Sequence, residues 1–138
     1  QDYNKAREYF EKAAELGNSY ALCGLGFLYH GGKGVEQDYN KAREYLEKAA
    51  ELGETYAVCS LGIIYKNGQG VEQDYKKARE YFKKAAELGN SYALRSLGNF
   101  YKDGLGVEQD YNKAREYYEK AAELGDEDAK EILKSLKK

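Results

Sequence analysis

The chain repeats the stretch VEQDYNKAREYLEKAAELG, residues 35–53, almost unchanged as VEQDYKKAREYFKKAAELG at residues 71–89. Its Gln-Asp-Tyr triplet occurs at Gln1, Gln37, Gln73 and Gln109, always 36 residues apart. A fixed period of this length is typical of proteins in which one supersecondary unit is stacked along an axis. Positions that are identical in every copy are those that stacking requires, so function is best sought where the copies differ.

Each copy predicts two helices joined by a glycine-rich loop. In the unit Gly17–Leu52, small and apolar residues recur at helical spacing over Tyr20–His30, which we name helix A. Three glycines within residues 31–34 interrupt this helix. Asp38 predicts the N-cap of a second helix, helix B, which carries an apolar stripe to about Leu52. Gly53 then predicts a left-handed residue that ends helix B.

This pattern predicts one all-α repeat domain over residues 1–138. Residues 17–52, 53–88 and 89–124 form three full repeats. A lone helix B precedes them at residues 1–16, and a capping helix follows them at residues 125–138. In that last helix, Lys134 stands where the repeats have a tight-packing glycine (Gly26, Gly62, Gly98) and Lys137 stands where they have a tyrosine. We therefore expect it to be a polar cap.

The first helix keeps the apolar residues of the interior copies and so reads as uncapped. We expect the parent protein to continue N-terminally with at least a helix A, and the start at Gln1 without Met suggests a processed or excised fragment. The same face makes end-to-end self-association with a second copy an alternative.

Composition excludes several function classes. The 22 Lys and Arg residues nearly balance the 24 Asp and Glu residues, so the net charge is −2 and no basic stripe for nucleic acid is expected. No apolar run approaches the ~20 residues that span a bilayer, and no signal-peptide pattern opens the chain. Cys23 and Cys59 lie one period apart, in helices too distant for a disulfide, so both are expected to be free thiols.

The combined motifs resemble the Sel1-like repeat family. They are Leu-Gly-x-x-Tyr at residues 61–65, Gly-x-Gly-Val at residues 68–71 and Lys-Ala-Ala-Glu at residues 84–87, and the combination occurs three times. The resemblance covers the whole chain and implies a right-handed α/α superhelix, a solenoid of helix-loop-helix repeats. It also implies an adaptor that binds proteins or peptides rather than an enzyme.

Two departures from the family pattern limit what the resemblance carries over. Tyr45, Tyr81 and Tyr117 stand where the family commonly has Trp. A cysteine-rich exported branch has cysteines at the places of Ala14 and Leu22, so its secreted location is not transferred and the compartment stays open.

No catalytic or cofactor pattern competes with this interpretation. Gly32-Lys33 lacks the first glycine, the Ser or Thr and the preceding strand of a phosphate-binding loop. His30 is the only histidine, and it lies about two helical turns from Cys23, so neither a His-based metal cluster nor a Cys–His pair is expected. Pentatricopeptide repeats of similar period read RNA, but the acidic pI and the Gly-x-Gly-Val loop argue against that here. A stacking platform of tyrosines for carbohydrate is a lesser alternative to core packing.

The copies differ mainly on one face of helix A. Positions four and then three residues apart vary between repeats, and a tyrosine extends the stripe upward. By the resemblance, this stripe lines the concave side of the superhelix. The predicted partner-binding residues are Tyr20, Cys23, Phe27 and His30 in the first repeat; Tyr56, Cys59, Ile63 and Lys66 in the second; and Tyr92, Arg95, Asn99 and Lys102 in the third.

The main hypothesis is a non-catalytic interaction module that binds a peptide along this stripe. Apolar partner residues would meet the first two repeats, and an acidic group would meet Arg95 and Lys102. The alternative is a consensus-like or engineered stack without a dedicated ligand, in which an exposed face has simply drifted. Phe27 and Ile63 favour the first hypothesis, because apolar residues exposed together mark contact sites.

Overall fold

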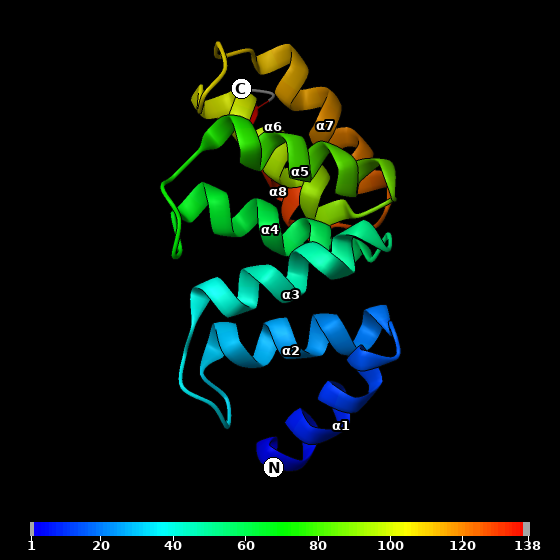
Figure 1. Ribbon diagram of the computed structural model, residues 1–138. Coiled ribbons are helices and arrows are strands. Elements are labelled where there is room, and N and C mark those ends of the chain that lie inside the picture. Colours follow the sequence, from blue (N-terminus) through cyan, green and yellow to red (C-terminus); the bar gives the residue numbers. More distant parts are fainter. Residues whose placement is uncertain (1, 137–138) are drawn as a thin grey trace. The chain divides into compact units, whose positions relative to one another are not determined.

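The computed structural model describes residues 2–136, and these form eight α-helices, with no strand assigned in that range (Figure 1). The chain divides into two compact units, residues 1–73 and 74–138. Unit 1 contains α1 (Tyr3–Glu15), α2 (Ser19–Gly31), α3 (Tyr39–Glu51) and α4 (Thr55–Asn67). Unit 2 contains α5 (Tyr75–Glu87), α6 (Ser91–Asp103), α7 (Tyr111–Glu123) and α8 (Glu127–Leu136).

The helix pairs follow the sequence prediction. Helix A of the first repeat is α2 and its helix B is α3, and Figure 1 shows the glycine-rich loop that turns the chain back between these two antiparallel helices. Asp38 is the N-cap of α3, with its Oδ1 accepting from the backbone N–H of Lys41 at 3.1 Å. Gly53 follows the helix with φ +84°, as predicted for a left-handed residue.

The glutamine of the repeated triplet has a structural function that the sequence did not reveal. Gln37 Nε2 donates to the backbone carbonyl of His30 at 2.9 Å. This carbonyl is one of those at the C-terminal end of α2 that have no hydrogen-bond partner within the helix. Gln109 donates in the same way to the carbonyl of Lys102 at 2.7 Å. The triplet therefore ties the end of helix A to the start of helix B, in addition to capping helix B with its aspartate.

The tyrosine of the triplet packs against the loop of the following repeat. In unit 2, Gly106 has φ +68°, and a Cβ built on it would lie 2.7 Å from the Cβ of Tyr75. Arg79 adds a hydrogen bond from its guanidinium to the Gly106 carbonyl at 3.1 Å. Both the left-handed backbone and the close tyrosine require glycine at this position of the Gly-x-Gly-Val motif.

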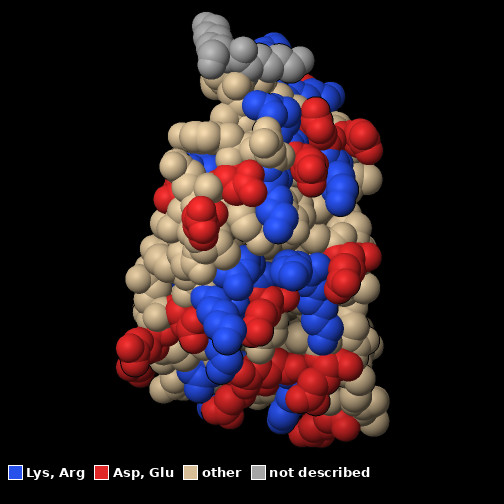
Figure 2. Space-filling model, turned by 90° about the horizontal axis from the view of Figure 1, so that it is seen from above, with Lys and Arg blue, Asp and Glu red and all other residues tan. Residues whose placement is uncertain are grey.

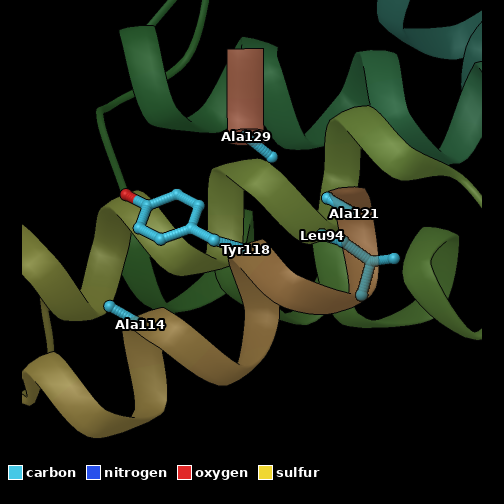
Figure 3. Close-up of a cluster of buried hydrophobic side chains, with 5 residues drawn as sticks. All are labelled: Leu94, Ala114, Tyr118, Ala121 and Ala129. Atoms are coloured by element: carbon cyan, nitrogen blue, oxygen red, sulfur yellow. The ribbon is translucent and has the colours of Figure 1, made fainter. Parts of the chain in front are cut away.

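The core of unit 2 is centred on Tyr118 of α7 (Figure 3). Its ring is fully buried and lies against Gly98, where an added Cβ would come within 2.6 Å of the ring. This confirms the prediction that the helix A glycine allows close helix packing. Figure 3 shows the buried side chains that α6, α7 and α8 contribute around it, namely Leu94, Ala114, Ala121 and Ala129.

The corresponding core of unit 1 is built from equivalent positions. Leu25 and Ala42 are fully buried, and the Tyr29 ring stacks on Tyr45 with centroids 5.9 Å apart. Gly26 faces Leu46 as Gly98 faces Tyr118, with 2.7 Å from a built Cβ to Leu46 Cγ. The same glycine-to-large-residue contact thus occurs in both units.

The terminal helices differ from the interior ones in burial. In α1 no residue is buried, and Phe10 is only half-buried where Leu46 and Phe82 are fully enclosed. In α8 the buried residue is Ala129, and Lys134, one of the two residues on which the prediction of a polar cap rests, is exposed beside Glu131. Lys137, the other residue of that prediction, lies outside the described residues.

Candidate partner-binding surface

The predicted stripe is divided between the two units, and its first two repeats lie in unit 1. There Tyr20, Phe27 and Tyr56 expose 76 %, 50 % and 53 % of their surface. Tyr20 and Phe27 come from α2, whose helical spacing places them on one face, and Tyr56 lies at the start of α4. Three large aromatic side chains are therefore available to solvent within one unit.

These side chains border an open hollow of about 550 Å³, which we name the aromatic hollow. Helix α1 closes one side of it, because its apolar face meets α2 here. Phe10, for example, lies against Gly24, so that an added Cβ would fall 2.7 Å from the Phe10 ring. The residues that line the aromatic hollow are Asp2, Tyr3, Ala6, Phe10, Tyr20, Cys23, Gly24, Phe27, Leu28, Glu54 and Tyr56.

A second hollow of about 240 Å³ adjoins the first. Phe27 and Tyr56 line both, and the second adds His30 and Ile63 from the predicted stripe. Six of the eight predicted residues of the first two repeats thus line one hollow or the other. Of the remaining two, Lys66 is half-buried near the end of α4 and Cys59 is buried. Phe27 and Tyr56 form the ridge between the two hollows.

The two cysteines of the predicted stripe are buried. Cys23 and Cys59 each expose only 7 % of their surface, although the stripe predicts a face open to a partner. Burial raises the pKa of both thiols to about 11, and the nearby Glu54 carboxylate adds to the rise in the pKa of Cys23. Neither cysteine is in a disulfide, as expected, and the buried Cys23 lines the aromatic hollow.

His30 is engaged within unit 1. Its Nε2 lies 3.0 Å from Oε1 of Gln69, and its ring lies 5.4 Å from the ring of Tyr39. Its partner Gln69 comes from the glycine-rich loop of the second repeat, one of the positions at which the copies differ. His30 therefore borders the second hollow with its orientation already fixed.

The third repeat lies in unit 2, and two of its predicted residues are bound by internal partners. Arg95 Nε donates to Asp126 Oδ2 at 2.8 Å, and its guanidinium lies 5.0 Å above the ring of Tyr92. Asn99 accepts a hydrogen bond from the hydroxyl of the buried Tyr118. The carboxylate of Asp126 therefore already occupies the guanidinium that the sequence analysis assigns to an acidic partner group. Lys102 is half-buried.

Glu54 belongs to the site but was absent from the prediction. It lies at the N-cap position of α4, where it makes no side-chain capping bond, whereas Asn18 and Asn90 cap their helices with 3.0 Å and 2.8 Å bonds. This position reads Asn18, Glu54, Asn90 and Asp126 along the chain, so it varies as much as the stripe does. Comparison of the N-cap positions would have found it.

Metal-ligating groups and charge were also surveyed over the part of the chain that the structure describes. No group of three metal-ligating side chains occurs within residues 2–136. On the face drawn in Figure 2, basic and acidic side chains are interleaved rather than gathered by sign. No helix in the same range is long and apolar enough to cross a membrane.

Comparison with known proteins identifies the repeat. A sequence model described as "Sel1 repeat" matches residues 1–18, 19–54, 55–90 and 91–126, with boundaries two residues later than the repeats predicted above. A search of curated proteins found no significant match.

Three solved structures are similar over nearly the whole chain. A Sel1 repeat protein from Oxalobacter formigenes is 36 % identical, with a TM-score of 0.92 over 96 % of this chain and 54 % of that one. The protective antigen c5321 of uropathogenic Escherichia coli is 38 % identical, with a TM-score of 0.90 over 98 % of this chain and 29 % of that one. Cysteine-rich protein B of Helicobacter pylori is 34 % identical, with a TM-score of 0.73 over 94 % and 93 %. The chain thus spans about half the length of the first protein and under a third of the second.

Proposed function

Since the chain belongs to the Sel1-like repeat family, an α-helical solenoid family whose members generally mediate protein interactions, we propose that it binds a short segment of a partner protein. The segment lies across the aromatic hollow and the adjoining second hollow of unit 1. The module acts by binding alone, in keeping with relatives that are structural repeat proteins rather than typical enzymes.

The observation that carries this proposal is the convergence of exposed aromatic side chains on one concave surface. Tyr20, Phe27 and Tyr56 are each at least half exposed and border the same hollow. Aromatic side chains dominate the binding energy of protein interfaces, especially where a partner side chain fills a pocket between them. Groups of apolar side chains exposed together also mark contact sites.

The dimensions suit successive side chains of one peptide. The aromatic hollow, at about 550 Å³, is within the usual range of ligand pockets, and the second, at about 240 Å³, has room for a smaller side chain. Because Phe27 and Tyr56 line both, a peptide that crosses their ridge contacts these rings on either side. Either an extended or a helical segment can place one of its side chains on each side of this ridge.

The alternative is a repeat scaffold without a dedicated ligand. The near-identical copies of helix B favour it, since they show how little the sequence has diverged outside helix A. Under this alternative the aromatic residues of the stripe have drifted on an exposed face. The two hypotheses differ in whether unit 1 selects any peptide at all.

Selection of random ten-residue peptides by display on the whole chain tests the proposal. We expect enriched peptides to bind the unchanged protein and to lose at least tenfold in affinity against the double variant Phe27→Ala, Tyr56→Ala. The matched control Tyr111→Ala, Leu124→Ala removes two side chains of similar exposure in unit 2, at 52 % and 56 %, and should bind as the unchanged protein does. Failure to enrich any peptide would favour the scaffold alternative.

A further inference from the structure

The third repeat holds an arginine in a setting that the first repeat lacks. Arg95 lies between the ring of Tyr92, at 5.0 Å, and the carboxylate of Asp126, at 2.8 Å. Its guanidinium is further contacted by Asp128 at 3.6 Å. A guanidinium that stacks on an aromatic face and pairs with a carboxylate uses both of its favourable contacts at once.

The equivalent positions two periods earlier, in unit 1, keep the aromatic ring and the carboxylate of this arrangement. Tyr20 occupies the position of Tyr92, and Glu54 occupies that of Asp126, each 72 residues earlier. The position of Arg95 is taken by Cys23, whose thiol has no cationic form. The tyrosine and the carboxylate are present without the arginine.

The space that an arginine would fill is open. Tyr20, Cys23 and Glu54 all line the aromatic hollow, and so does Tyr56, which replaces Asp128 and adds a second ring. Among all the residues that line the aromatic hollow, two carry a carboxylate, Asp2 and Glu54, and none is a lysine or arginine. The charged lining is therefore of one sign.

Glu54 holds no strong internal contact. It makes no capping bond to its own helix, and Ser19 Oγ donates to its Oε2 at 3.5 Å, the limit of a hydrogen bond. None of the ion pairs found within residues 2–136 involves it. A carboxylate beside apolar walls gains most from a cation that arrives with a ligand.

We propose that the aromatic hollow of unit 1 binds an arginine side chain of the partner segment. The guanidinium stacks on Tyr20, beside Tyr56, and pairs with the Glu54 carboxylate, as Arg95 does internally with Tyr92 and Asp126. The proposal rests on the proposed function and specifies the chemistry of its partner. It replaces the acidic partner group expected from the sequence with a basic one.

The displayed peptide library provides the first test. We expect arginine to be enriched at one fixed position of the selected peptides. Replacement of that arginine by glutamine should weaken binding to the unchanged protein at least tenfold, and Glu54→Gln should weaken the arginine peptide to a similar extent. In the Glu54→Gln background the peptide change should cost less than about threefold, because the two groups act on each other. Glu51→Gln, an exposed carboxylate outside the lining, is the control and should change little.

The variant Cys23→Arg tests the internal comparison directly. It supplies from within the arginine that the third repeat has, so we expect it to compete with the peptide's guanidinium and to reduce arginine-peptide binding at least tenfold. Cys23→Ser, which adds no cation, should retain binding within about threefold. Circular dichroism of each variant confirms that it folds.

The outcomes separate this inference from the function on which it rests. Peptides that bind without an arginine preference, unaffected by Glu54→Gln but lost on Phe27→Ala, Tyr56→Ala, would overturn the arginine site and leave the proposed function standing. Absence of any selected peptide would overturn both.

Discussion

Gly106→Ala is the most informative change to the fold, because two independent effects act at this position. Gly106 has φ +68°, where an alanine is less stable than glycine by about 1–2 kcal/mol. Its new Cβ would also lie 2.7 Å from the Cβ of Tyr75, well inside ordinary van der Waals contact. Tyr75 is the first residue of α5 and its Cβ cannot rotate away, so overpacking adds about 1–3 kcal/mol. The expected total is a loss of about 2–5 kcal/mol in the free energy of unfolding.

Gly89→Ala is the matched control for that change. Gly89 has φ +89°, but a Cβ added there has no neighbour within 4 Å, so only the backbone effect remains, at about 1–2 kcal/mol. Guanidinium unfolding of the whole chain, followed by circular dichroism, measures both variants. Equal losses, within about 0.5 kcal/mol, would contradict the argument that the triplet tyrosine supports the glycine loop of the next repeat.

Three further predictions follow from contacts in the two units. Arg95→Ala leaves Asp126, whose side chain is only 10 % exposed, without its cation, and should lower the free energy of unfolding by about 1.5–3 kcal/mol. The control Lys130→Ala breaks an exposed pair with Glu127 and should change this free energy by less than about 1 kcal/mol, so equal effects in thermal unfolding would count against a structural function for Arg95. Gly98→Ala adds a methyl group 2.6 Å from the Tyr118 ring and should lower the free energy of unfolding by about 1–3 kcal/mol, although alanine favours helices more than glycine does. A variant that is more stable in denaturant unfolding would refute the close packing of Gly98 against Tyr118. In the folded chain the pKa of Cys23 and of Cys59 is about 11, above the ordinary 9.0, so the unfolded chain releases these protons at lower pH and the free energy of unfolding should fall as pH rises from about 9 to 11. If a Cys23→Ala, Cys59→Ala variant lost stability just as steeply over this interval, the thiols would be excluded as the cause.

The fold was predictable because its determinants are local and repeated four times. Asp38 caps its helix and Gly53 ends it through contacts within a few residues, and such contacts follow directly from the residue types. The family resemblance and the matched structures agree with this. The function of Gln37, which donates to a carbonyl seven residues earlier, was not predicted. A glutamine that bonds the end of a helix and a glutamine that points to solvent look the same in a sequence.

The candidate site was predictable only in part, because it depends on contacts between helices. Tyr20, Phe27 and Tyr56 were found from the differences between repeats and are exposed on one hollow. Cys23 and Cys59 share the helical face but lie deeper than their neighbours, and helical spacing alone does not give depth. The pairing of Arg95 with Asp126 spans 31 residues and two helices, so a comparison made along helix A could not show it.

Amide chemical-shift mapping with a selected peptide tests whether the two hollows of unit 1 form the binding surface. We expect the largest shifts on peptide addition at residues 20–30 and 54–63, which surround the two hollows, while the amides of α5 to α8 change little. Shifts confined to α5 to α8, or to the outer faces of α1 and α3, would contradict a binding surface in the aromatic hollow of unit 1.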